Sequence, residues 1–480
     1  MRSNGTNAPA TAASDGVGST ATFPWLAVLA ATALAFALRV PALFQDPWID
    51  EVWSWGLARS RSSILDVLTI ESSNSHALNT LWIWLLGDQP TFLLYRLPSL
   101  LFGLASVPLA ARIALRHGRP AAICAAWIVA VSYLSVVYAT EARGYALLVL
   151  CSLLAFETAW TWLDTGDRRW LAASWACAAV GILAQTLFVV GWAAIALAVV
   201  LRIVREGRAS RWGRIAAYLG VPVGLFVVWW FVNVRHVFNA GAPPWDLAAV
   251  LTETLAWSLG LPVANWSLVL GAVLAAGILV LDARLLASRG DRTWVAQVGV
   301  ALVGSVATAI LLRHEYLAPR YFLVPLAFWS LSLARVLGHF AEVGRAGRVQ
   351  AASILVLFAA GNLAHAVPFL RVGRGAIGDL VRAMATRSDA RPIVVTGNYD
   401  FNVGALLEWH RRSLPAGREL VYVPQKQLPP GGPDFAVTDH PHFESEPPTA
   451  IRIGTRSYDV VGVSRHAGPS GSDWAVYQRR

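Results

Sequence analysis

The chain has 480 residues, of which 56% are hydrophobic and only 14% charged, and its mean hydropathy is +0.51. Soluble domains carry roughly a quarter charged residues, so this composition excludes an ordinary soluble protein and predicts an all-α polytopic membrane protein. The net charge of +10 does not indicate a nucleic-acid partner, because the basic residues are nearly all arginines in short loops between apolar segments.

A polar segment rich in Ser, Thr, Gly and Ala opens the chain, and residues 1–23 are typical of a disordered tail. Apolar segments follow, and we expect eleven membrane helices. The first lacks a small-residue cleavage site, so we expect it to be retained. The expected ranges are 24–43, 96–115, 119–139, 143–163, 168–186, 188–205, 211–234, 264–287, 293–312, 319–338 and 348–369. The fifth and sixth are the least distinct, since almost nothing separates them.

Arginine placement predicts the topology. With the N-terminus in the cytoplasm, the loops on that side carry the clustered arginines, and the opposite side carries fewer and more scattered ones. We therefore expect a cytoplasmic tail and a C-terminal region outside the membrane. Lys426 is the sole lysine, and this bias, with abundant Ala, Gly and Val, is typical of a GC-rich bacterial genome. The expected location is the bacterial inner (plasma) membrane.

The first outer segment, residues 44–95, is longer than an ordinary turn and carries the adjacent acids Asp50 and Glu51 among three tryptophans. Carboxylates at a membrane interface are costly, so the pair predicts a water-facing site at headgroup depth. The piece Ala77–Leu86 is too short to span and too apolar for solvent, and we expect a juxtamembrane helix. The second long outer segment, 235–263, predicts a lid or another interfacial helix.

The acid pair is a candidate for general-base catalysis. A partly desolvated carboxylate beside an acceptor hydroxyl suits that role. The alternative is an interfacial loop that carries two solvated acids. Because neighbouring side chains diverge, we expect only one of Asp50 and Glu51 to be the base.

Further polar residues stand at the outer ends of expected spans. Arg143 could bind a phosphate through its fork of donors, and Glu141 could orient Arg143 or an acceptor. The alternative is a helix-connecting turn with a snorkelling arginine. Arg320-Tyr321 has the same character, and two or three such arginines that converge would make an anion site, whereas one alone is more often an anchor. His76, as a lone histidine, is more often structural.

Several kinds of site are not indicated. The three cysteines lie inside apolar runs, without metal-ligand spacing, so no zinc site is indicated. No glycine-rich phosphate loop or nucleotide-binding fingerprint is present in the sequence, so we expect no cofactor and no cytosolic nucleotide donor.

The composition changes after residue 370, where short apolar runs alternate with Gly- and Pro-rich turns. We expect an extracytoplasmic α/β domain over 371–480, outside the membrane domain of 24–370. The expected strands are Pro392–Thr396, Glu419–Val423, Phe435–Thr438, Tyr458–Ser464 and Trp474–Gln478, and the expected helices are Leu380–Arg387 and Asn402–Arg412.

These motifs, in this order, resemble the C-type membrane glycosyltransferases (GT-C), in the branch of the bacterial protein mannosyltransferases and the lipid A aminoarabinose transferase. The likeness covers about residues 24–165. It is carried by the acid pair, His76 before a short amphipathic helix, the helix start Arg96-Leu97-Pro98-Ser99, and the turn Glu141-Ala142-Arg143-Gly144-Tyr145. The chain departs from the family pattern after His76, where Ala77-Leu78-Asn79 replace two prolines, and at Thr140, which replaces a frequent glutamine.

The resemblance implies a polyprenyl-phosphate sugar donor and transfer, with inversion, to a hydroxyl of a glycan, lipid or protein acceptor on the outer face. Mannosyl transfer is an expectation from the branch. Asp50 would be the base with Glu51 as its partner, and Arg143 and Arg320 would hold the donor phosphate. The pocket residues that it implies are His76, Glu141, Tyr145 and Tyr321. Membrane lipids are the further expected partners, and the branch implies that no metal is needed.

The alternative function is a non-enzymatic transporter or lipid-binding protein. A transporter would show polar residues near the middle of several spans, or broken helices in corresponding halves. In this sequence the ionisable residues gather at one face, with Gln185 and Glu157 as the main exceptions. That asymmetry favours interfacial chemistry over passage.

Overall fold

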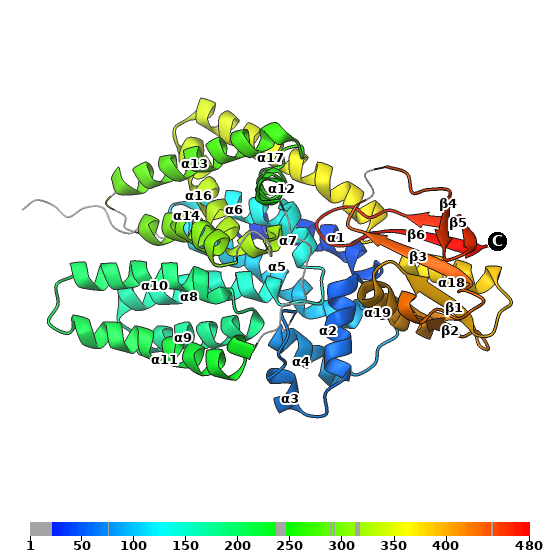
Figure 1. Cartoon of the computed structure of the whole chain (residues 1–480). Coiled ribbons are helices and arrows are strands. Elements are labelled where there is room, and N and C mark those ends of the chain that lie inside the picture. The colour runs from blue at the N-terminus through cyan, green and yellow to red at the C-terminus, as the bar shows by residue number, and fades with distance from the viewer. Residues whose placement is uncertain are drawn as a thin grey trace, which may run out of the picture.

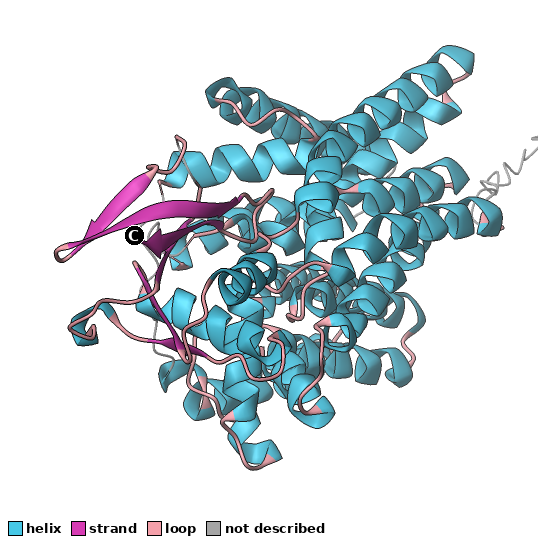
Figure 2. Ribbon diagram, turned by 90° about the vertical axis from the view of Figure 1, so that its right-hand side faces the viewer, coloured by secondary structure: helices cyan, strands magenta, loops and turns pink. Residues whose placement is uncertain are grey.

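The structure is a computed structural model, and it describes residues 22–74, 76–236, 246–288, 290, 293–312, 317–442 and 445–480. The expected disordered tail therefore lies almost wholly outside the described residues, as does the Pro243-Pro244-Trp245 part of the second outer segment. Long helices form one part of the molecule, and a sheet lies at one end of them (Figures 1 and 2).

Every expected membrane segment is helical. The helices are α1 (Trp25–Arg39), continued by η1 (Val40–Phe44), α5 (Leu93–Leu115), α6 (Arg119–Val131), α7 (Tyr133–Tyr138), α8 (Tyr145–Thr165), α9 (Arg168–Ala184), α10 (Phe188–Arg205), α11 (Arg211–Val232), α13 (Asn265–Ser288), α14 (Thr293–Leu311), α16 (Leu323–Glu342) and α17 (Arg345–Val372). Among the described residues, eight helices are long and apolar enough to cross a membrane. The other three expected spans, α6, α9 and α14, are not among these eight, so length and composition give fewer spans than the eleven expected.

Local backbone geometry explains two boundaries in this set. Gln185 is extended, with φ −165° and ψ 127°, and it ends α9, so the two least distinct segments are separate helices. Ser132 has ψ 120° and divides the expected span 119–139 into α6 and α7.

Small residues let the helices approach closely. A Cβ on Gly338 of α16 would lie 2.7 Å from the Cα of Ala121 in α6, and one on Gly103 of α5 would lie 2.4 Å from the Cβ of Ala139. Backbone contact of this kind is how membrane helices pack, because lipid supplies no hydrophobic drive between them.

Glu157 is one of the two main exceptions to the gathering of ionisable residues at one face. It pairs with Arg112 at 3.3 Å and Arg116 at 3.0 Å.

Shorter helices gather with the sheet at one end of the long ones (Figure 1). They are α2 (Ile49–Arg59), α3 (Ile64–Leu68), α4 (Ala77–Leu86) and α12 (Leu247–Leu259). α4 is a helix over the residues for which we expect a juxtamembrane position, and α12 occupies part of the second outer segment. Asp50 and Glu51 lie in the first turn of α2, where the helix dipole favours negative charge.

The C-terminal region is an α/β unit, as expected. Its elements are α18 (Ile377–Arg387), β1 (Ile393–Gly397), α19 (Asp400–His410), β2 (Leu420–Tyr422), β3 (Phe435–His440), β4 (Ala450–Ile453), β5 (Arg456–Ser464) and β6 (Asp473–Arg479). The strand order is β2-β1-β3-β6-β5-β4, with β1 parallel to both β2 and β3 and the other pairs antiparallel. The sequence missed β4, a four-residue edge strand that is mostly solvent-facing.

Aromatic side chains join this unit to the short helices. Trp409 of α19 meets Trp55 of α2 at a ring-centroid distance of 5.1 Å and Phe92 at 4.5 Å. Each of these three side chains is buried. The C-terminal unit is therefore packed against the segment that carries the acid pair.

Candidate active site

The two adjacent acids have different surroundings. Glu51 is fully buried and forms a two-bond ion pair with Arg96, whose Nε donates to Oε1 at 2.8 Å and whose Nη2 donates to Oε2 at 2.6 Å. Burial opposes the charge of Glu51, but the charge and hydrogen bonds of Arg96 outweigh it and lower the pKa of Glu51. Glu51 is thus held ionised, with both oxygens occupied.

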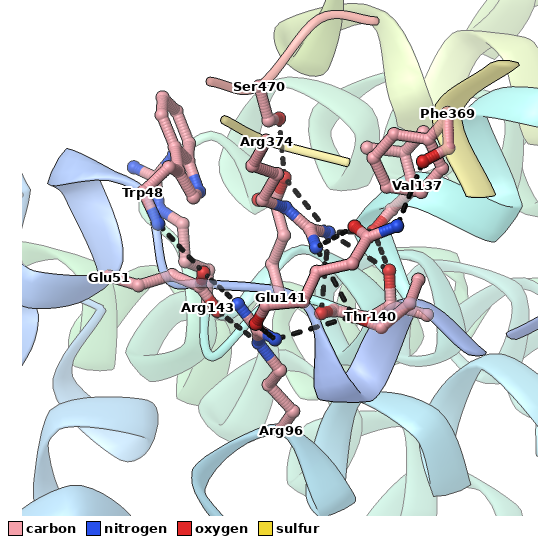
Figure 3. A network of polar contacts seen from close by, with 12 residues as sticks. Trp48, Glu51, Arg96, Val137, Thr140, Glu141, Arg143, Phe369, Arg374 and Ser470 are labelled. Atoms are coloured by element: carbon pink, nitrogen blue, oxygen red, sulfur yellow. Dashed lines mark hydrogen bonds and ion pairs between the residues drawn. The ribbon is translucent and has the colours of Figure 1, made fainter. Parts of the chain in front are cut away.

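The same pair ties three chain segments together (Figure 3). Arg96 lies at the start of α5 and also donates to the carbonyls of Leu43 at 2.9 Å and Gln45 at 2.7 Å, just after α1. Glu51 Oε1 accepts the backbone N–H of Ala142 at 2.8 Å. The motif Arg96-Leu97-Pro98-Ser99, taken from sequence as a helix start, is therefore also the anchor of Glu51.

Asp50 instead faces two arginines. Its Oδ2 lies 2.7 Å from Arg143 Nη1 and 3.7 Å from Arg320 Nη1, and the side chain keeps 15% of its surface exposed. Asn74 fixes this arrangement, because its Oδ1 accepts from Arg143 Nη2 at 2.8 Å and its Nδ2 donates to the Asp50 carbonyl at 2.8 Å. The structure thus brings together the expected base and both expected phosphate ligands.

Trp48 lies beneath both guanidinium groups. Its ring centroid is 5.5 Å from Cζ of Arg143 and 5.8 Å from Cζ of Arg320. The expected pocket residues Tyr145 and Tyr321 add further aromatic faces, at 4.8 Å from Arg143 and 5.2 Å from Arg320 respectively. Stacking on aromatic faces holds the two cations close together despite their repulsion.

Several polar atoms around Asp50 are buried and have no hydrogen-bond partner among the described residues. They are Nε of Arg143, Nε of Arg320, Nε1 of Trp48 and Oη of Tyr145. Unpaired buried donors are costly, and native proteins rarely keep them without a ligand or water. Two guanidinium groups against one carboxylate leave one positive charge in excess. The arrangement fits an anionic ligand rich in hydrogen-bond acceptors.

His76 forms a wall of this site. Its buried ring meets Tyr145 edge to face at 5.0 Å, and Nδ1 lies 3.3 Å from the Ala184 carbonyl. Burial, followed by the charge of Arg143, lowers the pKa of His76 well below its ordinary value, so the ring is neutral. The neutral ring donates from Nδ1, which leaves the lone pair on Nε2 as an acceptor. Gly144 is required beside it, since a Cβ there would lie 2.1 Å from the Ala184 oxygen.

Glu141 belongs to a second cluster. Its buried carboxylate accepts from Ser470 Oγ at 2.5 Å and lies 4.0 Å from Nη2 of Arg374 (Figure 3). Arg374 also donates to Gln45 Oε1 and to Thr140 Oγ1, each at 3.0 Å. The structure therefore places Glu141 in a contact with the C-terminal region, a role that sequence reasoning did not assign.

Four further residues of the two clusters escaped the sequence analysis. Trp48 and Asn74 lie in the outer segment that was already singled out, but neither has a motif of its own. Arg374 lies 234 residues from Thr140, which it contacts, and Ser470 lies 329 residues from Glu141. No local pattern marks them, apart from the Gly-Pro-Ser-Gly composition around Ser470.

A cavity of about 50 Å³ adjoins the site. Its wall is mainly apolar, from α5, α6, α7, α8 and α16, with several serines. Tyr138 and Tyr145 line it, and their rings meet at 5.4 Å. Since Tyr145 also packs on Arg143, the cavity begins beside the arginine pair.

Removing the charge of Glu51 should destabilise the protein. Glu51→Gln leaves the Arg96 cation buried without a counter-charge, which costs about 3–5 kcal/mol. Asp379→Asn is the matched control, because its carboxylate is 71% exposed and pairs with Arg382 at the surface, where such a pair contributes about 0–1 kcal/mol. Thermal unfolding of the purified proteins in detergent should show a large fall in midpoint for Glu51→Gln alone. Equal midpoints for the two variants would contradict the anchoring role.

Comparisons with known proteins bear on the fold. At the level of sequence, no family model and no curated protein matches the chain. Among solved structures, the chain is similar to ArnT from Cupriavidus metallidurans in the apo state, with TM-score 0.53 and 14% identity over 94% of this chain and 97% of that one. The same enzyme bound to undecaprenyl phosphate gives TM-score 0.52 and 15% identity over 95% and 98%.

A third similar structure is the Archaeoglobus fulgidus oligosaccharyltransferase in complex with Zn and sulfate, with TM-score 0.50 and 11% identity over 86% of this chain and 68% of that one. ArnT is a GT-C aminoarabinose transferase, so two of these three structures come from the branch that the motifs resemble. The likeness extends over nearly the whole chain, well beyond the N-terminal third that carries the motifs. The chain has the fold of the GT-C membrane glycosyltransferases.

Proposed function

We propose that the protein is a membrane glycosyltransferase that moves a sugar from a polyprenyl-phosphate donor to a hydroxyl acceptor, with inversion. The observation that carries the proposal is the convergence of Arg143 and Arg320 on Asp50 across the face of Trp48, with buried donors left unpaired. A phosphate offers the negative charge and the acceptor oxygens that these groups lack. The branch of the resemblance makes mannose the sugar to test first.

The arginines would act on the leaving group. As the bond between the anomeric carbon and the phosphate oxygen breaks, negative charge grows on that oxygen. Guanidinium groups that are always protonated and poorly hydrated stabilise such charge more strongly than water does. A phosphate monoester is already a good leaving group, so the site needs no general acid.

Asp50 would act on the acceptor. Its carboxylate takes the hydroxyl proton, the acceptor oxygen bonds to the anomeric carbon, and polyprenyl phosphate leaves from the opposite face of the sugar. Without donor, Asp50 is paired to Arg143 at 2.7 Å. An incoming phosphate competes for Arg143, and this competition would free the carboxylate as a base only in the presence of donor.

The wall of the cavity suits the part of the donor lipid next to the phosphate. It is mainly apolar, and it begins beside Arg143 through Tyr145. The ArnT structure with undecaprenyl phosphate shows that a protein of this fold binds such a lipid, which supports the proposal. We propose the topology that the arginine pattern predicts, with the N-terminus in the cytoplasm. The reaction would then take place on the outer face of a bacterial inner membrane, where a glycan, lipid or protein would present its hydroxyl.

Asp50→Asn should abolish transfer while donor binding survives. Loss of a general base lowers kcat by about 100- to 10,000-fold, whereas the amide leaves both arginines free for the phosphate. Mass spectrometry of a reaction with purified protein, polyprenyl-phosphate mannose and a mixture of envelope acceptors measures the product. Asp379→Asn, a surface acid, is the control. Full activity of Asp50→Asn would remove Asp50 from the mechanism.

Loss of either arginine charge should weaken binding of the donor phosphate. Arg143→Gln and Arg320→Gln each remove a charge-assisted contact, and we expect affinity for a short-chain polyprenyl phosphate to fall about tenfold or more. Native mass spectrometry of the complexes measures this, with the phosphate-free polyprenol as a ligand control. Arg382→Gln, at a surface arginine that is 53% exposed, is the protein control. If all three variants bind equally, the phosphate lies elsewhere.

A further inference from the structure

The segment between β5 and β6, residues 465–472, joins the C-terminal sheet to the helical part. We name it the β5–β6 loop. The Ala467 N–H donates to the Gly373 carbonyl at 2.9 Å, just after α17. A Cβ on Gly468 would lie 2.2 Å from Oη of Tyr133, and one on Gly471 would lie 2.5 Å from the Arg374 carbonyl. The loop thus lies in backbone contact with the helical part, where side chains at its glycines would clash.

The loop carries one hydroxyl to the helical part. Ser470 is 1% exposed, and its Oγ donates to Oε1 of Glu141 at 2.5 Å. The other carboxylate oxygen of Glu141 has no hydrogen-bond partner among the described residues, and Arg374 stays 4.0 Å away. In the part of the chain that the structure describes, Ser470 is therefore the residue that donates a hydrogen bond to this buried carboxylate.

Glu141 opens the turn that presents Arg143. The turn is closed by the Arg143 N–H, which donates to the Glu141 carbonyl at 2.8 Å. The N–H of its middle residue, Ala142, donates to Glu51, and the Arg143 carbonyl accepts from Ser99 Oγ at 3.0 Å. Ser470 thus adds a tie from the C-terminal region to a turn otherwise fixed by α2 and α5.

The base of the loop is braced. Asp473 is fully buried and accepts both the backbone N–H and the ring Nδ1–H of His466 at 2.8 Å, and Arg465 lies 3.3 Å from it. Asp473, His466 and His442 place their ligand atoms within 4.8 Å of one another, a spacing that could hold a metal. The bonds to His466 and Arg465 already serve that carboxylate, so the cluster fits a brace that stiffens the loop.

We propose that Ser470 is a positioning residue for the reaction: through Glu141 it fixes the turn that holds the Arg143 guanidinium opposite Asp50. The C-terminal region then contributes a residue that positions the active site. This inference rests on the proposed glycosyl transfer, and it adds a contribution from a residue that touches neither donor nor acceptor.

This hydrogen bond favours the charged form of Glu141. Burial raises the pKa of Glu141 and the charge of Glu51 adds to that rise, whereas the charges of Arg374 and Arg143 and, to a smaller extent, the Ser470 hydrogen bond oppose it. Removal of the hydroxyl raises the pKa further, so Glu141 takes up a proton at a higher pH. A neutral Glu141 no longer balances Arg374, and the turn loses its tie. Activity should then fall on the acid side at a higher pH than in the wild type.

Ser470→Ala tests the proposal, with Ser464→Ala as the matched control. Ser464 ends β5, and its Oγ accepts from the Ala376 N–H at 2.7 Å, away from the turn. We expect Ser470→Ala to lower kcat about 10- to 100-fold, the loss typical of a hydrogen bond to a charged group, and to move the acid limb of the pH–rate profile upward. Ser464→Ala should change neither. Ser470→Cys keeps the packing with a weaker donor, and its pH profile should follow that of Ser470→Ala.

The outcomes separate the two ideas. If the wild type transfers sugar and Ser470→Ala or Ser470→Cys keeps the wild-type kcat and pH profile, the positioning role is wrong and the proposed function stands. If both variants and Ser464→Ala lose activity only in proportion to a lower unfolding midpoint, the loop is merely structural. If the wild type neither transfers sugar nor binds polyprenyl phosphate, the proposed function falls, and the positioning role falls with it.

Discussion

The buried ion pair between Glu51 and Arg96 is the interaction on which the site depends. Two opposite charges leave water at a cost that their attraction repays only when the remaining donors and acceptors are satisfied. Arg96 meets that condition with backbone carbonyls after α1, and Glu51 meets it with the N–H of Ala142. One pair therefore joins α1, α2, α5 and the turn before α8, and it fixes where Asp50 lies.

The charges around this pair form two groups, an inner one and an outer one. Glu51 and Arg96 form the inner group with Glu141 and Arg374, which tie the turn and the C-terminal region together. The outer group is Asp50 with its two arginines, and it retains unpaired donors and an excess positive charge. An outer group held in place by the Glu51–Arg96 pair is what preorganised catalysis requires, because the groups need no rearrangement when charge develops.

Sequence patterns predicted the helices because lipid demands long apolar segments, whatever their tertiary contacts. They also located the acid pair, since adjacent carboxylates at a membrane interface are costly. Spacing alone did not divide the roles within the pair, because the partner that buries Glu51 is 45 residues away; only the family resemblance made Asp50 the base. The contact between Ser470 and Glu141 joins residues 329 positions apart, and a serine in a glycine-rich loop has no periodicity that would reveal it.

The central claim is that Arg143 and Arg320 bind a phosphate across the face of Trp48. The most direct measurement is an experimental structure of the protein with a bound polyprenyl phosphate. The account predicts phosphate oxygens within hydrogen-bond distance of both guanidinium groups, with the part of the prenyl chain next to the phosphate at the cavity beside Tyr145. A phosphate bound away from both arginines, with the Asp50–Arg143 pair unchanged, would contradict it.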